Sequence, residues 1–505
     1  MRRPLSSALV LALAAACSAP SDAGDPVILP ALTEARLTTA ERIDPTHTVD
    51  TNASRQPSRP ENIEAMLAEG FGQSRMVAGE PILTRTLDGL DAAAALPAGA
   101  VRLARFVHLA DTQLADDESP SRVARLDTPG TGSGAYRPQE AFGCVMLRAA
   151  VRTINAVHRA TPLDAVVLGG DNADNAQVNE IDWFLSILGG TRNVHCDSGD
   201  NDNPVAGPDN DPKDPISSEG LQAPWRWVTG NHDVLNQGTI RISVNPDEPT
   251  GSLASTGTRD WSLPGGPVRT GQFVVPDAQR AYLAPIALMK RISTDGDGHG
   301  IGAAQVASGH ANYTFDLGAK VRVVVLDTAA ETGSAEGVVR QPLIDSFLKP
   351  ALEQAKSLGK LVIITSHHSS QNLTDGSDVG GVKQSDAVLG PAFRALLASY
   401  GNVIMHLAAH SHEHSAVVVP GARPYWEVKT SALADFPNQL KMYEVWDTGE
   451  GHIVIRGVAF DYTTDKDPLA AQARALAITD LCSGYSPDGR GTARDRNVDL
   501  WLPKP

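Results

Sequence analysis

The sequence predicts an α/β fold in which helices cover a central β-sheet. Two features of the chain carry this prediction. From about residue 101, short apolar runs alternate with segments of helical periodicity, which is typical of α/β architectures. Several apolar runs also end in a cluster of polar residues, and open α/β sheets bind ligands beyond the carboxyl ends of their strands.

The expected strands of this region each end close to a polar residue. They cover 105–110, 165–168, 225–229, 321–326, 361–366 and 403–408. The polar residues that follow them are Asp111, Asp171, Asn231, Asp327, His367 and His410. Because the carboxyl ends of parallel strands meet at one edge of a sheet, we expect a site to form there.

Helices are expected between these strands. One follows Pro138 and places Phe142, Met146, Ala149, Ala150 and Val157 on one face. Others cover 343–358, where Gly359 is a plausible C-cap, and about 391–400. Four later runs, at 416–419, 425–429, 441–446 and 452–460, predict a closing layer of antiparallel strands.

The chain begins with a targeting segment. Arg2 and Arg3 precede a short apolar run that ends at Cys17. The sequence around Cys17 resembles a bacterial lipoprotein cleavage site, although Ala14 stands where a larger apolar residue is usual. We therefore expect export to the bacterial cell envelope with a lipid anchor to the membrane at Cys17; an ordinary signal, leaving a periplasmic or secreted protein, is the alternative.

Four segments are expected in the organisation of the chain. They are a signal peptide of lipoprotein type (1–17), an N-terminal tether and peripheral arm (18–99), the main domain (100–465) and a C-terminal tail (466–505). The formal net charge of -16 argues against nucleic acid as a partner. The composition, 42% apolar and 20% charged, is that of a soluble globular protein.

Three further features are left open by the sequence. Cys196 and Cys482 lie in polar loops and could form a disulfide, whereas Cys144 fits a buried apolar position; the pairing stays undecided. The Asp-rich segment 197–218 could ligate calcium, but its spacing is not that of an EF-hand, so we favour a solvated acidic loop. The segment 238–302 is long for a loop and could cover the mouth of the site.

The polar clusters contain the ligand types of a metal centre. They read Asp111-Thr112-Gln113, Gly170-Asp171, Gly230-Asn231-His232-Asp233, His367 and His410-Ser411-His412. Carboxylate, amide oxygen and imidazole bind borderline or hard divalent metals, and the absence of cysteine argues against structural zinc. Any one of these residues alone could be a helix cap, a turn residue or an interior histidine. Their joint order favours two metal ions that share one carboxylate.

This order of clusters resembles the calcineurin-like metallophosphoesterases, whose pattern is D-x-H, G-D, G-N-H-[ED], a lone His and G-H-x-H. The resemblance covers Asp111 to His412 and makes 100–465 the expected catalytic domain of a metallophosphoesterase-like layered fold. Two positions depart from the pattern, since Gln113 stands for His and Ala409 for Gly. The Asp-x-Gln form of the first motif is similar to that of exported bacterial members.

The resemblance implies a role for each site residue. The first metal would be held by Asp111, Gln113, Asp171 and His412, and the second by Asp171, Asn231, His367 and His410. His232 would contact the phosphoryl oxygen or protonate the leaving group, and Asp233 would orient its imidazole. The two ions would be manganese, iron or zinc. Because an amide oxygen is a harder ligand than imidazole, Gln113 is expected to favour manganese at the first site.

These roles predict a metal-dependent phosphoester hydrolase that uses a metal-bound hydroxide on a small phosphorylated substrate, either a monoester or a diester. The alternative is a non-catalytic or calcium-dependent surface-binding lipoprotein on the same scaffold.

Overall fold

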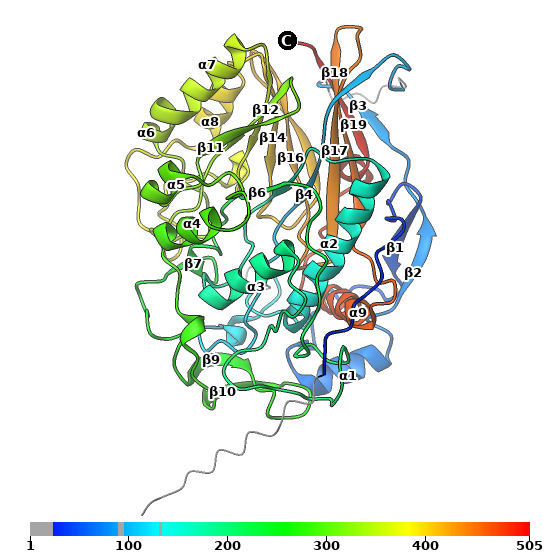
Figure 1. Ribbon diagram of the computed structural model, residues 1–505, viewed down its shortest axis with the longest axis vertical. Coiled ribbons are helices and arrows are strands. Elements are labelled where there is room, and N and C mark those ends of the chain that lie inside the picture. The colour runs from blue at the N-terminus through cyan, green and yellow to red at the C-terminus, as the bar shows by residue number, and fades with distance from the viewer. Residues whose placement is uncertain (1–23, 89–94, 131–133) are drawn as a thin grey trace, which may run out of the picture.

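The computed structural model describes residues 24–88, 95–130 and 134–505 of the chain. The expected signal peptide over 1–17, including Cys17, lies outside the described residues. The α/β prediction is confirmed, because two central sheets lie face to face with helices on their outer sides (Figure 1). Within the described ranges, no helix is both long and apolar enough to cross a membrane.

The first sheet has seven strands in the order β3-β19-β18-β17-β4-β5-β6. Their bounds are β3 (Leu83–Arg85), β19 (Val498–Pro503), β18 (His452–Asp461), β17 (Gln439–Asp447), β4 (Val101–Leu109), β5 (Ala165–Leu168) and β6 (Trp225–Arg226). Strands β4, β5 and β6 are parallel, and β17 runs antiparallel to β4. The carboxyl ends of β4, β5 and β6 therefore meet at one edge.

The second sheet has six strands in the order β11-β12-β13-β14-β16-β15. Their bounds are β11 (Tyr313–Leu317), β12 (Val321–Val325), β13 (Leu361–Thr365), β14 (Val403–Ala408), β16 (Tyr425–Lys429) and β15 (Ser415–Val419). Strands β12, β13, β14 and β16 are parallel. They are apolar almost throughout, because a parallel sheet is buried on both faces.

Alternate side chains of the second sheet serve two separate cores. Val362 and Ile364 of β13 pack with Leu352 and Phe393, which belong to helices α7 (Lys349–Ser357) and α8 (Gly390–Leu397) on the outer face. The intervening Ile363 belongs to the larger core that both sheets share. Because successive side chains of a strand point to opposite faces, one face of this sheet packs on the helices and the other on the seven-stranded sheet.

Helices α2 (Gly143–Ala160), α3 (Val178–Gly189) and α9 (Pro468–Cys482) accompany the seven-stranded sheet (Figure 1). Val145, Leu147 and Val151 of α2 are buried in the same core as Phe106 and Val107 of β4. The amphipathic pattern after Pro138 therefore predicted the right helix, because its apolar stripe faces the sheet.

The C-terminal part of the chain corrects two expectations. The late strands do not form one closing layer, since β15 and β16 join the six-stranded sheet while β17 and β18 join the seven-stranded one. The segment 466–505 is not a tail, because it supplies α9 and the interior strand β19. In the N-terminal arm, β3 pairs with β19, and β1 (Glu41–Pro45) pairs with β2 (Ser74–Ala78).

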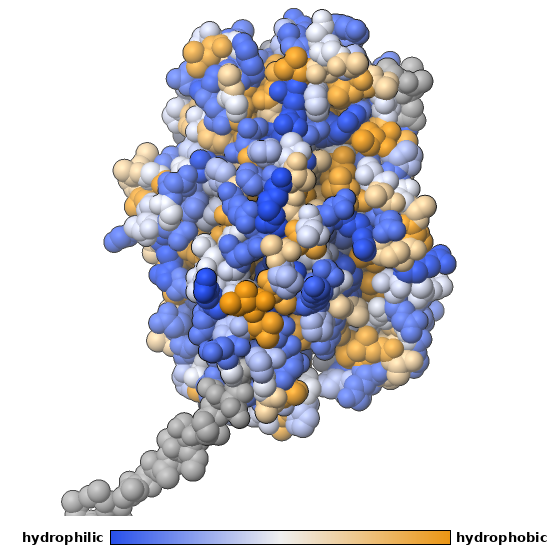
Figure 2. All heavy atoms as spheres, turned by 45° about the vertical axis from the view of Figure 1, so that its right-hand side comes forward, coloured by the Kyte–Doolittle hydropathy of each residue, from blue (hydrophilic) through white to orange (hydrophobic). Residues whose placement is uncertain are grey.

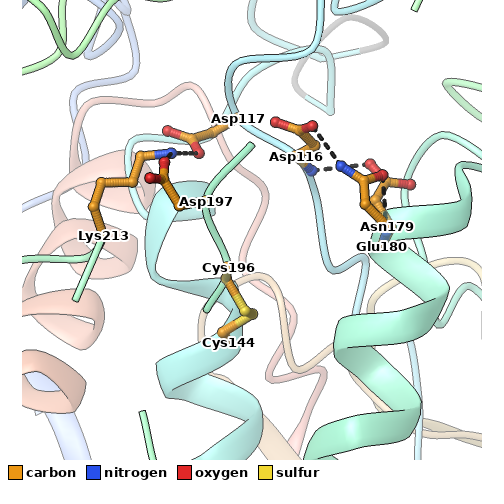
Figure 3. Close-up of a disulfide and its surroundings, with 8 residues drawn as sticks. All are labelled: Asp116, Asp117, Cys144, Asn179, Glu180, Cys196, Asp197 and Lys213. Carbon is orange, nitrogen blue, oxygen red and sulfur yellow. Dashed lines mark hydrogen bonds and ion pairs between the residues drawn. A yellow bond between two sulfur atoms is a disulfide. The ribbon is translucent and has the colours of Figure 1, made fainter. Parts of the chain in front are cut away.

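The structure contains the disulfide whose pairing the sequence left undecided. Cys144, in the first turn of α2, is bonded to Cys196, whereas Cys482 is a buried free thiol (Figure 3). Cys144 is buried as its apolar context predicted. The loop that follows α3 folds back onto α2 and brings Cys196 to it, a long-range contact that residue periodicity does not encode.

The Asp-rich loop is not simply solvated. Lys213 is buried, and its ammonium group lies 2.9 Å from Asp117 Oδ1 and 2.5 Å from Glu118 Oε2. Asp197 lies on the other side of the same ammonium, at 3.6 Å (Figure 3). Lys213 thus brings to these carboxylates the positive charge that a calcium ion would supply. The face of the molecule shown in Figure 2 is mainly hydrophilic, with hydrophobic residues in small groups.

Candidate metal centre

The expected ligands come from both sheets and meet at the carboxyl ends of their strands. Asp111 follows β4, Asp171 follows β5, His367 follows β13, and His410 and His412 follow β14. Ligand atoms of Asp111, Asp171 and His367 all lie within 4.8 Å of one another. Facing edges of two sheets therefore build one cluster from segments that are some 300 residues apart in the sequence.

Asp171 occupies the middle of this cluster. Its Oδ2 lies 3.1 Å from His367 Nε2 and 3.4 Å from Gln113 Nε2. Asp111 Oδ1 lies 3.5 Å from His412 Nε2 and 4.0 Å from His367 Nε2. This arrangement suits a carboxylate shared between two neighbouring ions.

The backbone of the cluster is held in an uncommon conformation. Asp111, Gln113, Asp171, His410 and His412 all have positive φ, between 41° and 68°. For residues other than glycine, each such position costs about 1–3 kcal/mol, and such costs concentrate at functional sites. Ala409, by contrast, is not among the described residues with positive φ, so Ala in place of Gly needs no special backbone there.

Three buried atoms of the cluster have no hydrogen-bond partner. They are Asn231 Oδ1, Gln113 Oε1 and His367 Nε2. Buried polar atoms are nearly always paired, so unpaired ones need an explanation such as a missing ion. Asn231 Nδ2 donates to Gly238 O at 2.9 Å, which fixes the opposite amide oxygen toward the cluster. All three atoms can ligate metal, and the residues present therefore fit such a centre.

The remaining nitrogen of each of two histidines is fixed by a second partner. His367 Nδ1 donates to Gly169 O at 2.8 Å, and His412 Nδ1 donates to Asp435 Oδ2 at 2.5 Å. Asp435 in turn accepts from Arg137 Nε at 2.7 Å. Such partners set the tautomer of a metal-binding histidine and leave Nε2 free. Asp435 and Arg137 were not predicted from the sequence, because neither belongs to a motif.

His232 is oriented by a different carboxylate from the expected one. Its Nδ1 lies 2.8 Å from Asp174 O and 3.1 Å from Asp174 Oδ1, while Nε2 lies 4.0 Å from Asp171 Oδ2. Asp233 instead accepts hydrogen bonds from the backbone of Asn172, Ala173 and Gly230. The expectation that Asp233 orients the imidazole is therefore wrong. Asp233 braces the loop, since neighbouring residues in a turn point apart.

Glycine is required beside His232. Gly238 has a φ of +60°, and a Cβ there would lie 2.2 Å from His232 Cδ2. The loop after the G-N-H-D motif thus closes directly against the imidazole. Any larger residue at 238 would displace the ring or the loop.

The carboxylates of the cluster raise the pKa values of two of its histidines. Burial lowers the pKa of His367, but the carboxylates of Asp171 and Asp111 raise it by more, to about 9. His412 follows the same pattern beside Asp111 and Asp435, and its pKa rises to about 10. Protons thus neutralise the carboxylates when no other cation does, and binding of a metal would release them.

The cluster opens into a pocket of ≈ 560 Å³. Gln113, Asp171, Asn231, His232, His410 and His412 line its inner part. That volume lies in the range of small-molecule sites. The start of the segment 238–302 contributes Thr239 and Ile240 to its wall, in agreement with a position at the mouth.

Four other histidines of the described chain have interior hydrogen-bond partners. His108 contacts Thr430, His368 contacts Thr328, His406 contacts Glu427 and His414 contacts Gln439. His368 also lies beside the cluster, with its ring centroid 4.5 Å from that of His410.

No protein-family model matches the sequence, and no curated protein matches it. Solved structures that show a distant similarity to this chain include a dimetal phosphatase from Danio rerio, at a TM-score of 0.38 and 14% identity over 72% of this chain and 100% of that one. The sulfate thiohydrolase SoxB of Thermus thermophilus has a TM-score of 0.32 and 14% identity, over 76% of this chain and 60% of that one. GAP50, the anchor in the inner membrane complex of Plasmodium, has a TM-score of 0.31 and 11% identity, over 78% of this chain and 97% of that one. Likenesses this distant assign no function.

Proposed function

We propose that this chain is a calcineurin-like metallophosphoesterase that hydrolyses a phosphoester bond at a centre of two divalent metal ions. The observation that supports it most is the convergence of Asp111, Asp171 and His367 around unpaired buried ligand atoms. Five predicted ligands held at positive φ add to it, because such costly backbone conformations concentrate at functional sites.

The first ion would be held by Asp111, Gln113, Asp171 and His412. The second would be held by Asp171, Asn231, His367 and His410. Manganese, iron or zinc fits this set of carboxylate, amide and imidazole ligands. When bound, the pair supplies the positive charge that polarises a phosphoryl group and activates a water molecule.

His232 is placed to assist the departing group. Its Nδ1 is fixed by Asp174, so Nε2 faces the inner part of the pocket. Burial lowers the pKa of His232, but Asp171 and Asp174 raise it by more. The pKa of the imidazole is therefore above its usual value, and the ring can hold a proton for a leaving oxygen.

The substrate of the enzyme is a small phosphorylated molecule, because the net charge of -16 disfavours nucleic acid as a partner.

Asp171→Asn tests this proposal. The variant should bind fewer than two ions per chain and lose turnover of mono- and diester substrates across manganese, zinc and iron, because the shared carboxylate is gone. Asp499→Asn is the matched control, since Asp499 of β19 is a buried carboxylate paired with Arg456 of β18. Two ions and normal turnover in Asp171→Asn would refute the shared role. Two ions without turnover in the parent would favour the non-catalytic alternative.

We also propose that the chain is exported and lipid-anchored at Cys17. The Cys144–Cys196 bond supports an oxidising compartment. Cys17→Ser should move the protein from the membrane fraction to the soluble fraction, because the several acyl chains of a lipoprotein anchor firmly. Equal fractionation of the two proteins would leave plain secretion as the better account.

A further inference from the structure

The outer wall of the metal-site pocket differs in character from its inner part. Apolar side chains from three separate segments line it, namely Val123 and Leu126, Ile240, and Val379. Leu126 is 59% exposed, Ile240 38% and Val379 85%. Exposed apolar residues that gather at one opening commonly mark a place where an apolar ligand is buried.

The segment that carries Leu126 is firmly held. Ala124 is buried, and the guanidinium of Arg122 bonds to Asp174 and Glu140 inside the protein. Thr256 Oγ1 donates to Arg122 O at 2.6 Å. The protein therefore presents Leu126 to solvent from a fixed backbone, at a cost in exposed apolar area that packing could have avoided.

The loop that carries Val379 is also anchored, beside the segment of Ile240. Thr374 Oγ1 donates to Asp378 Oδ2 at 2.8 Å, and Gly381 N donates to Asp378 O at 2.9 Å. A Cβ at Gly380 would lie 3.1 Å from Thr239 O, so the two loops lie in contact. Ile240 and Val379 thus belong to one continuous part of the pocket wall.

The residue types of the wall limit which organic groups of a substrate it could bind. Among the described residues that line the pocket there is no Phe, Tyr or Trp on which a nucleobase could stack. Its charged residues, Arg137, Asp171 and Asp435, belong to the inner site and not to the opening. A flexible aliphatic chain, which needs neither aromatic stacking nor ion pairs, fits this wall.

We propose that the substrate is a phosphoester whose organic part is an aliphatic chain, bound against Leu126, Ile240 and Val379 while the phosphate occupies the metal centre. This inference rests on the proposed function for its phosphate end. It adds the class of the organic group, which no motif of the sequence encodes.

Two substrate series test it on the full-length, metal-loaded protein. The first is n-alkyl phosphates from butyl to decyl, whose leaving alcohols have nearly the same acidity. The second is n-alkyl p-nitrophenyl phosphates, in which the leaving group is constant. Each substrate is used below its critical micelle concentration, so that it is monomeric. In the series that is cleaved, kcat/KM should rise about three- to fourfold for each methylene that the wall buries, until the wall is covered.

Substitutions on the wall should reduce this dependence on chain length. Leu126→Ser and Val379→Ser remove apolar area at exposed positions and should flatten the rise of kcat/KM with chain length. Leu358→Ser and Val205→Ser are the matched controls, since Leu358 is 55% exposed and Val205 52% and neither lines the pocket. Both controls should keep the parent's slope. An unchanged slope in the wall variants, or a nucleoside monophosphate preferred to octyl phosphate, would overturn the inference.

Binding of n-alkylphosphonates, which contain no ester bond, separates this inference from the proposed function. Their Kd, measured by calorimetry, should fall with chain length whether or not any ester is cleaved. A falling Kd without turnover would support the aliphatic wall and refute the hydrolase. Turnover with no dependence on chain length in kcat/KM or Kd would refute the wall and keep the hydrolase. No dependence and no turnover would refute both.

Discussion

Replacing Asp435 by Asn should weaken the first proposed metal site through His412, one of its expected ligands. The carboxylate accepts two hydrogen bonds, from His412 Nδ1 at 2.5 Å and from Arg137 Nε at 2.7 Å. An amide of the same shape has only one oxygen, so in either orientation its NH₂ group must face one of these donors. The substitution therefore removes one charge-assisted bond at no cost in volume.

The expected magnitude follows from that single lost bond. A hydrogen bond to a charged group contributes about 1.5–3 kcal/mol, and loss of a bond that orients a metal ligand usually lowers affinity about 10- to 100-fold. Titration of manganese into the metal-free chain by calorimetry should show this loss at one of two sites, with the other unchanged. Asp499→Asn is again the control, because Asp499 accepts two bonds from Arg456 at 2.8 Å far from the cluster.

The reasoning fails if Asp435→Asn and the parent bind manganese with equal affinity at both sites. A lower melting temperature alone would not rescue it, since breaking the pair with buried Arg137 destabilises the fold in any case. In that event Asp435 would be a structural partner of Arg137 only.

Three further predictions concern the site and the disulfide. His232→Ala should lower turnover about 10²–10⁴-fold with unchanged metal content, and by less for esters with acidic leaving groups; equal losses across leaving groups would contradict the proton-donor role. Gln113→His should tighten the first site and shift its preference toward zinc or iron in metal titrations, whereas identical affinities would mean that Gln113 is not a ligand. Cys196→Ser should lower the free energy of unfolding by about 4 kcal/mol, the entropic value for cross-linking residues 52 apart, as measured by denaturant unfolding. Reduction of the parent should have the same effect, and no change on reduction would argue against the Cys144–Cys196 bond.

Local patterns predicted most of the sheets and the inner site. The strands at 165–168, 403–408 and 425–429 have the expected bounds, because an apolar run between polar clusters defines a buried strand. Asp171 and His410, which follow the first two of these strands, line the same pocket, because each lies at the carboxyl end of a parallel strand in its own sheet. The roles assigned to Asp111, Asp171 and the other ligands remain predictions.

Features that depend on long-range contacts were not predictable in this way. Asp435 reaches His412 from a loop between β16 and β17 that has no motif. Asp174 takes the place expected for Asp233, because the direction of a side chain in a turn does not follow from adjacency in sequence. Lys213 escaped notice because one lysine among many aspartates does not change the composition of its loop.

The pairing of β4 with β17 has a consequence for how the chain matures. β4 lies between β5 and β17, with His108 opposite Lys441. A nascent chain that has reached His412 therefore already contains every expected metal ligand, yet it lacks three strands of the seven-stranded sheet. Contacts this distant in sequence form slowly, and only when the last strands are present. If this cluster binds metal, loading would thus be a late event, and a chain interrupted before β17 would contain the expected ligands without the strands that hold them in place.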